Sequence, residues 1–490
     1  MAEIKEICKK RAKEIYGKKV PEFITERIAE EDKKINELGI SHALKEWIEI
    51  SELAKENDVP HVFRNPAAAS LTAYLSGAGY LNPLPAHYLC ACGYYEFPEV
   101  EPKIRECAPD LPDKLCPKCN KPLRKDGYDI PAECCFPEEK TRSAVTVVES
   151  TTEFFDKVLS KRYVAVTREE AERSPLFPQR SKAVQRNITE AEKIEERVLR
   201  HIGINGTNFK TYIYKKESTG EGNNLLIVGQ VHPHLELLVN LEKRVGKKVS
   251  EATYGDPKTF TLFRNNTMLG NTGMLMPTPF GTVGVPVFGA KRGALILEKI
   301  RPVRFGQLIR IAGLIIGGSS WEKNALDSFR EEGAKMEDII TSRDDVYKFL
   351  ERYNVPKDRI MVIMDHIVNS RTVEENAFRE LGHYGVPDFF EYSLSNIQYL
   401  FSRNYIIYNN SLAWQTAWYK AYYPEAFYRE YIETYATDEM KAMIRAGRNK
   451  VIEMCEENDP ETASDLGRAK MVEYPLLRVA LEMYERGFTF

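Results

Sequence analysis

Two close pairs of cysteines form the most specific chemical pattern in this sequence. Cys90 and Cys92 are separated by one residue, and Cys116 and Cys119 are separated by two. Four thiolates can surround one zinc ion in a tetrahedron with Zn–S bonds of ~2.3 Å, and two close pairs commonly supply them. The surrounding segment is rich in proline and poor in core residues, so a metal would supply much of its folding energy. We therefore predict a structural zinc site; four metal-free thiols are the alternative, because the first pair lacks the two-residue spacing.

The other five cysteines have less specific surroundings. Cys107, Cys134 and Cys135 are close enough in sequence to compete as metal ligands, whereas Cys8 and Cys455 occupy helical positions typical of packing. The total of nine is odd, and the N-terminal sequence alternates charges without the apolar stretch of a secretory signal. These features predict a reducing, cytoplasmic environment, where metal binding or packing is favoured over disulfides.

Length and charge exclude several classes of protein. A chain of 490 residues predicts about two to four domains. Its 69 Lys and Arg against 72 Asp and Glu leave a net charge of −3, which excludes a uniformly basic coat but not a local basic groove. The longest apolar run, 308–318, contains Arg310 and is far shorter than the ~20 residues of a membrane-spanning helix, so no membrane partner is expected.

The pattern of apolar residues predicts a mixed first half and a helical second half. Helices are expected up to about residue 60, the second starting after Pro21 and the third capped by Ser41. Runs of β-branched and aliphatic residues predict strands at 143–148, 210–215 and 223–231. From about residue 255, helical blocks joined by short Gly/Pro turns continue to the end. The expected fold class is therefore α/β followed by α.

Seven segments also match a known family in the order that the family has them. They are NPLPAHYLCACGYYEF (82–97), PDLPDKLCPKCNKPLRKDGYDIP (109–131), GTVGVPVFGAK (281–291), IRIAGLIIGGSSW (309–321), SRDDVYKFLERYNV (342–355), WYKAYYPEAFY (418–428) and LEMYERGFTF (481–490). In these segments the chain resembles the palm and fingers of the PolC-type bacterial DNA polymerase III alpha chain. The resemblance implies a nucleotidyltransferase-like palm at 1–254, with a zinc insert at 88–125 and a shortened region at 150–216, followed by helical fingers at 255–490.

The resemblance places aliphatic residues where the family holds its catalytic metals. Nucleotidyl transfer uses two Mg²⁺ ions, which are bound by carboxylate oxygens. The family supplies an Asp-x-Asp on one strand and a third Asp on a nearby strand. These positions fall on Val145 and Val147, and near Leu226. Valine and leucine cannot bind Mg²⁺, so the resemblance implies a degenerate active site.

The family's Gly/Ser-rich loop, which holds the incoming triphosphate, and other active-site features are also replaced. The Gly/Ser-rich loop reads VFRNPAAAS at 62–70, in which only Arg64 and Ser70 keep the expected character. The family's Lys-Ala-His beside the fingers becomes Arg403-Asn404-Tyr405, and its GLSHGT becomes GLIIGG at 313–318. Glycine turns and apolar positions survive while ligand positions do not, which indicates a fold kept for something other than catalysis.

Other acids and histidines offer alternatives. The acids that could replace the missing aspartates, Glu133, Glu138, Glu139 and Glu149, are more typical of a solvated loop and a helix start. A transition metal could be bound by His232 and His234 with Glu236, as part of repurposed metal chemistry. With only two histidines, ordinary loop residues are the simpler interpretation.

Local basic stretches are the candidates for DNA binding. The stretch 291–310 contains a single acid and six cations, namely Lys291, Arg292, Lys299, Arg301, Arg304 and Arg310. Six phosphate contacts would make binding strongly dependent on salt; a mixed-charge helical face is the alternative. The stretch 441–450 is more typical of a solvated helix. The aromatic residues of 414–428 could stack on bases but are more typical of a core.

These observations support one hypothesis and one alternative. The hypothesis is a catalytically inactive PolC-like pseudoenzyme that serves as a DNA-binding or interaction scaffold in DNA replication or repair. It would bind primer-template or duplex DNA, with replication or repair proteins as further partners. The alternative is an active DNA-directed DNA polymerase core, for which Mg²⁺ would be required. Both hypotheses include a structural zinc ion and a location in the bacterial cytoplasm, where the protein could associate with the nucleoid.

Overall fold

The computed structural model describes residues 2–136, 145–166, 211–216, 225–270, 278–327, 336–368, 380–458 and 468–490. Three amphipathic helices begin the chain: α1 (Ala2–Tyr16), α2 (Glu22–Leu38) and α3 (Ser41–Glu56). They are the three helices that the apolar periodicity predicts. Ser41 does not cap the third helix as expected, because the helix begins at Ser41 itself and Ile40 occupies the cap position.

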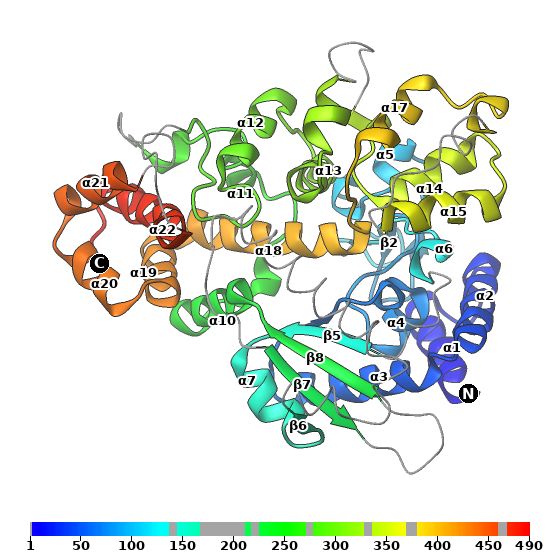
Figure 1. Ribbon diagram of the computed structural model, residues 1–490. Coiled ribbons are helices and arrows are strands. Elements are labelled where there is room, and N and C mark those ends of the chain that lie inside the picture. The colour runs from blue at the N-terminus through cyan, green and yellow to red at the C-terminus, as the bar shows by residue number, and fades with distance from the viewer. Residues whose placement is uncertain are drawn as a thin grey trace.

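A five-stranded sheet follows these helices (Figure 1). Its order is β1 (His61–Phe63), β5 (Val145–Ser150), β8 (Leu225–Val231), β7 (Thr211–Lys216) and β6 (Val164–Val166). β5 and β8 are parallel, while the other neighbouring strands are antiparallel. β7 and β8 confirm the predicted strands at 210–215 and 223–231 in their described residues, since residues 210, 223 and 224 lie outside the described part of the chain. β5 confirms most of the third prediction, and residues 143 and 144 lie outside the described part of the chain.

One face of the sheet packs on the N-terminal helices. Trp47 of α3 stacks on Phe63 of β1, and its indole N–H donates to Thr146 Oγ1 at 2.8 Å. Farther along this face, Gly229 lies against Phe155, and a Cβ at Gly229 would fall 2.2 Å from that ring. Because side chains alternate along a strand, Val147, Glu149, Val228 and Gln230 belong to the opposite face.

A second, smaller sheet forms the cysteine-rich segment. Its order is β3 (Tyr95–Glu96), β2 (His87–Leu89) and β4 (Arg124–Asp126), all antiparallel. It packs on a small apolar cluster that includes Tyr88, Leu111 and Leu123. Short helical elements surround both sheets: η1 (Pro66–Ala69), α4 (Leu71–Ser76), α5 (Pro102–Arg105), η2 (Ala108–Asp110), α6 (Ala132–Cys135), α7 (Thr152–Phe154) and the π-helix η4 (Phe155–Leu159).

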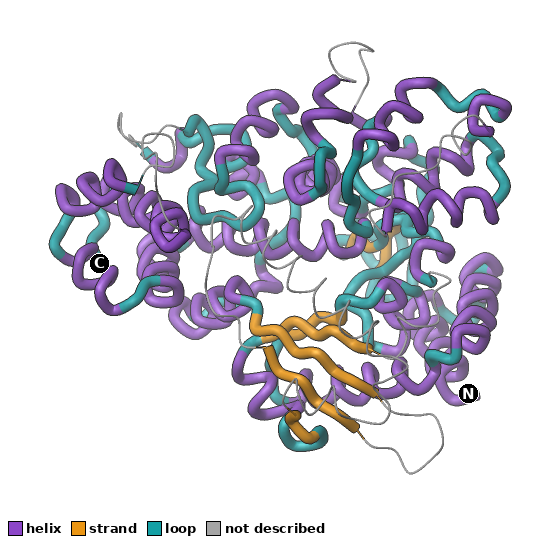
Figure 2. The backbone as a smooth tube through the Cα atoms, viewed as in Figure 1, coloured by secondary structure: helices purple, strands orange, loops and turns teal. Residues whose placement is uncertain are grey.

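The second half of the chain is helical, as its sequence predicts (Figure 2). Its helices are α10 (Pro233–Val245), α11 (Pro257–Thr261), α12 (Lys291–Ile300), α13 (Phe305–Ile316), α14 (Arg343–Arg352), α15 (Lys357–Val368), α17 (Asp388–Asn396), α18 (Arg403–Tyr422), α19 (Pro424–Tyr435), α20 (Asp438–Arg445), α21 (Arg448–Glu457) and α22 (Arg468–Glu485). The long helix α18 runs through the middle of the molecule, between the five-stranded sheet and α11–α13 (Figure 1).

The residues of α18 explain its central place. Its buried side chains lie on every side of the helix, which is typical of a helix enclosed by the protein. Trp414 stacks on Phe263 and meets Phe305 edge-on, so the aromatic stretch 414–428 forms mainly core, as its spacing predicts. One continuous apolar core extends from Ile4 to Met483. Within the described ranges, no helix has the length and apolar character needed to span a bilayer.

Candidate functional site

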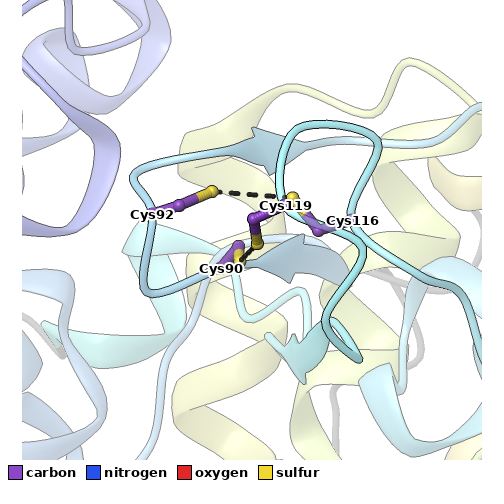
Figure 3. Close-up of side chains that lie close together, drawn as sticks. All are labelled: Cys90, Cys92, Cys116 and Cys119. Carbon is purple, nitrogen blue, oxygen red and sulfur yellow. Dashed lines mark hydrogen bonds between the residues drawn. The ribbon is translucent and has the colours of Figure 1, made fainter.

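The four predicted cysteine ligands lie together in the structure (Figure 3). Their sulfur atoms all lie within 4.8 Å of one another. Cys90 Sγ is 3.4 Å from Cys119 Sγ, and Cys92 Sγ is 3.6 Å from Cys116 Sγ. Four sulfurs bonded to one zinc at ~2.3 Å would be about 3.8 Å apart in a regular tetrahedron. The cysteine cluster therefore has close to the size that a tetrahedral zinc site requires.

Two tight turns position these sulfurs. In the first, Gly93 N–H donates to the Cys90 carbonyl, and Gly93 has a φ of 82° that favours glycine. In the second, Asn120 N–H donates to the Cys116 carbonyl at 2.8 Å. Backbone N–H groups of the second turn also lower the pKa of Cys116 to about 7, although burial opposes this shift. A thiol with a lowered pKa is suited to metal binding, because the thiolate is the ligand.

The competing cysteines lie elsewhere. Cys107 and Cys135 are buried, and burial raises the pKa of both thiols. In the described ranges, the Cys90–Cys119 cluster is the only group of three or more His, Cys, Asp or Glu side chains with ligand atoms this close together. His232, His234 and Glu236 therefore do not form a metal centre in this structure. Glu236 instead accepts a hydrogen bond from Thr152 N–H at 2.6 Å.

The three positions predicted to be degenerate, Val145, Val147 and Leu226, lie on the adjacent parallel strands β5 and β8. Val145 pairs in register with Leu226, and Val147 pairs with Val228. Val228 is fully buried, and Val147 is half-buried on the same face of the sheet. If the family's third aspartate aligned with Val228 instead of Leu226, that position on β8 would therefore still hold an aliphatic residue.

One acid does lie on this face, and it is already paired. Glu149 Oε1 is 2.6 Å from Arg64 Nη1, and the two side chains are 5% and 8% exposed. Arg64 also donates to Gln230 Oε1 at 3.2 Å, and its guanidinium carbon lies 4.6 Å from the centre of the Tyr405 ring. Arg64 is one of the two residues that the sequence predicts to be kept from the family's triphosphate loop. In this structure its charge is matched by a carboxylate of the protein itself.

The rest of that loop is a short 3₁₀ helix, η1. Asn65 Oδ1 accepts from Ala67 N–H, and Ser70 Oγ accepts from Ala73 N–H. Glu31 of α2, which is fully buried, accepts from Leu71 and Thr72 N–H at 3.1 and 2.7 Å. Side chains of the protein thus accept hydrogen bonds from four N–H groups of this region, those of Ala67, Leu71, Thr72 and Ala73. The sequence indicates Ser70 but not Glu31, because nothing in an amphipathic helix shows that one of its glutamates accepts hydrogen bonds from a distant loop.

A buried ionic cluster next to the cysteine-rich segment was also missed. Glu106 Oε2 accepts a hydrogen bond from Arg310 at 2.9 Å, and its backbone carbonyl accepts from Arg403 at 3.0 Å. Lys348 Nζ lies 3.6 Å from Glu106 Oε1, and Asp345 lies 3.6 Å from Arg310. Burial alone would raise the pKa of Glu106, but Arg310, Arg403 and Lys348 outweigh it and hold the pKa well below its ordinary value.

The six predicted DNA-binding cations differ in how exposed their side chains are. Arg292, Arg304 and Arg310 are held in ion pairs within the protein, and Arg310 is only 6% exposed. That burial is incompatible with a phosphate contact by Arg310, so we remove it from the candidates. The exposed members are Lys291, Lys299 and Arg301, on or beside α12, with exposed Leu295 and Val303 nearby in sequence.

Comparison with known proteins shows which proteins this chain is similar to. Residues 233–380 match the finger domain of the bacterial DNA polymerase III alpha subunit. The match begins within the range that the sequence assigned to the first domain, and the boundary at 254/255 stays a prediction.

The chain is also similar along its whole length to PolC-type DNA polymerases. It is 27% identical to the PolC-type DNA polymerase III of Caldanaerobacter subterraneus subsp. tengcongensis, in an alignment that covers 100% of this chain and 38% of that protein. It is 27% identical to the PolC-type enzyme of Thermotoga maritima, with 99% and 38% covered, and 26% identical to that of Bacillus subtilis, with 100% and 37% covered. The predicted resemblance is confirmed. The chain spans less than two fifths of the length of these relatives.

Proposed function

We propose that this chain is a PolC-like DNA-binding scaffold that does not catalyse nucleotidyl transfer. The observation that carries the proposal is the paired arrangement of Val147 and Val228 on adjacent parallel strands. Two Mg²⁺ ions need several carboxylate oxygens within a few ångströms of each other. At the expected place the two strands carry aliphatic residues.

The pairing of Glu149 further supports this proposal. Glu149 lies two residues from Val147 on the same face of β5, and Arg64 is in contact with one of its oxygens. A carboxylate already paired with a buried guanidinium binds a metal cation poorly, because the metal must displace Arg64 or lie beside it. Glu149 is therefore a poor substitute for the missing aspartates.

Zinc belongs to this proposal as a structural metal. Cys90, Cys92, Cys116 and Cys119 would hold it, and bound zinc would fix the two turns relative to each other. The small apolar cluster beneath the second sheet is too limited to fix them alone. DNA would be contacted by Lys291, Lys299 and Arg301, and the scaffold would operate with replication or repair proteins in the bacterial cytoplasm.

The second candidate is an active polymerase core, and the similarity to PolC-type polymerases along the whole chain favours it. A primer-extension assay separates the two. The purified chain is incubated with primer-template, the four dNTPs, and Mg²⁺ or Mn²⁺, with a PolC-type polymerase as positive control. We expect no extension by this chain, together with retardation of the same primer-template in a gel at low salt. Template-directed incorporation above background would overturn the scaffold proposal. Absence of retardation at every salt concentration would overturn the DNA-binding part of it.

A further inference from the structure

A buried contact joins the sheet to α18 through residues far apart in the chain. On the sheet side, Arg64 follows β1 and is paired with Glu149 of β5. On the helix side, Tyr405 in the first turns of α18 presents its ring to the Arg64 guanidinium at 4.6 Å. A cation over an aromatic ring is attracted most strongly where water is excluded. Both charged side chains here are at least nine-tenths buried.

A second contact lies beside the first. The hydroxyl of Tyr80, which follows α4, donates at 2.8 Å to the backbone carbonyl and the side-chain oxygen of Asn404. The Tyr80 ring lies 5.9 Å from that of Tyr408, one turn along α18. Two consecutive residues of α18, Asn404 and Tyr405, therefore contact the segment that contains η1 and α4. In the resemblance, one side of this contact is the place of the family's triphosphate loop, and the other is the place of its Lys-Ala-His beside the fingers.

The charges within this contact are matched by the protein alone. His232 Nε2 lies 4.0 Å from Glu149 Oε2, and burial lowers the pKa of His232, so its imidazole is neutral at pH 7. Arg64 then faces one carboxylate and one amide oxygen, from Glu149 and Gln230. If α18 moved away from the sheet, the Arg64–Glu149 pair would lose the aromatic ring that covers it. The electrostatics therefore favour one fixed position of α18.

We propose that Arg64, Glu149, Tyr405, Tyr80 and Asn404 form a latch that holds α18 on the sheet without any nucleotide. The latch makes the sheet and the helical half move as one body. It also fills, with side chains of the protein, the contact between two segments that in the resemblance belong to the family's active site. This inference goes beyond the proposed function, since it concerns motion and not catalysis.

Hydrogen exchange on the full-length chain, without nucleotide or DNA, tests the latch. The variants are Arg64→Ala, Tyr405→Ala, their double variant, and Tyr405→Phe, which keeps the ring. Tyr405→Ala is expected to raise exchange in 403–412 and in β5 on the order of tenfold, the effect of ~1.4 kcal/mol of lost coupling. Arg64→Ala should raise it further, because it also leaves Glu149 buried without its partner. The double variant should exchange about as fast as Arg64→Ala alone, because Arg64→Ala already removes the contact with the Tyr405 ring. Tyr405→Phe should behave as the unmodified chain.

Two controls keep the outcome decisive. Arg11→Ala removes an exposed arginine paired with Glu14 at 2.8 Å and should leave exchange in 403–412 unchanged. If Arg64→Ala does not fold, Glu149→Gln replaces it, since the amide keeps the volume and weakens the ion pair. Unchanged exchange in α18, or effects that multiply in the double variant, would overturn the latch. The readout contains no nucleotide, so a positive primer-extension assay would contradict the proposed function and leave the latch standing.

Discussion

Arg310 Nη2 donates a hydrogen bond to Glu106 Oε2 at 2.9 Å, although the two residues are 204 positions apart in the chain. Glu106 belongs to the cysteine-rich segment, and Arg310 belongs to α13. Arg403 of α18 contacts the same glutamate. One buried carboxylate thus connects the cysteine-rich segment to two helices of the second half.

The first prediction concerns this carboxylate. Glu106→Ala leaves Arg310 and Arg403 buried without their main anion, and breaking a buried ion pair from one side costs about 3–5 kcal/mol. Asp345 stays near both arginines, so we expect a loss of about 3 kcal/mol in the free energy of unfolding. Thermal and urea unfolding measure it. Glu14→Ala, which removes an exposed pair with Arg11, is the control and should change stability by less than about 1 kcal/mol. Equal stability of the two variants would refute the role of Glu106.

The sequence does not predict this ionic cluster. Arg310 was placed on a DNA-binding face because cations are dense in 291–310, and local density does not reveal distant partners. The burial of Arg310 is decided by Glu106 and Asp345, which come from other segments. In contrast, β5 and β8 were predicted well, because strands buried on both faces consist of consecutive apolar residues. The cysteine cluster was also predictable from local sequence, because the spacing within the two cysteine pairs indicates a metal site.

The surroundings of the predicted aspartate positions could be predicted only in part. The resemblance placed the degenerate aspartates at Val145, Val147 and near Leu226, and the register of β5 with β8 brings these positions together. No property of the sequence indicated that Glu149 pairs with Arg64 or that Tyr405 covers the pair. Those contacts depend on how α18 crosses the sheet, which is set by the packing of both halves.

The second prediction is a pH dependence caused by His61. Burial lowers the pKa of His61 to about 4, and its Nε2 lies 2.9 Å from Ser51 Oγ. The unfolded chain binds a proton near pH 6.5, before the folded chain does, so the stabilisation is complete above pH 6.5 and is lost as the pH falls towards 4. His61→Gln cannot titrate. Between pH 7 and pH 5 the unmodified chain should lose about 2 kcal/mol more stability than His61→Gln, measured by urea unfolding at both values. Parallel pH profiles for the two proteins would contradict the assignment.

The third prediction concerns metal content. The chain purified without chelator should contain one zinc per chain by elemental analysis, and Cys116→Ser should retain almost none, because three sulfurs bind zinc far more weakly than four. Limited proteolysis should then cut 88–125 much faster in the variant. Cys455→Ser, which alters a cysteine of α21 outside the cluster, should keep its zinc and its resistance. If the chain without metal were fully folded and protease-resistant, packing alone would hold the four cysteines in place, and the zinc prediction would be wrong.

The fourth prediction concerns the exposed cations of α12. Lys291, Lys299 and Arg301 are exposed, and each phosphate contact contributes ~0.9 to the slope of log K against log[salt]. Changing all three to Gln should therefore reduce that slope by about 2–3 and weaken binding to unrelated DNA sequences equally, as measured by fluorescence anisotropy across salt concentrations.

The matched control removes the same number of charges elsewhere. The control cations lie on other helices: Lys441 and Arg445 of α20 are paired with Glu433, and Lys450 of α21 is paired with Glu453. Changing this second set to Gln should leave the salt slope unchanged, even though the net charge falls by the same three units. If both triple variants lose affinity equally, binding depends only on net charge. The face of α12 would then have no special role, and DNA contact would have to be sought elsewhere on the chain.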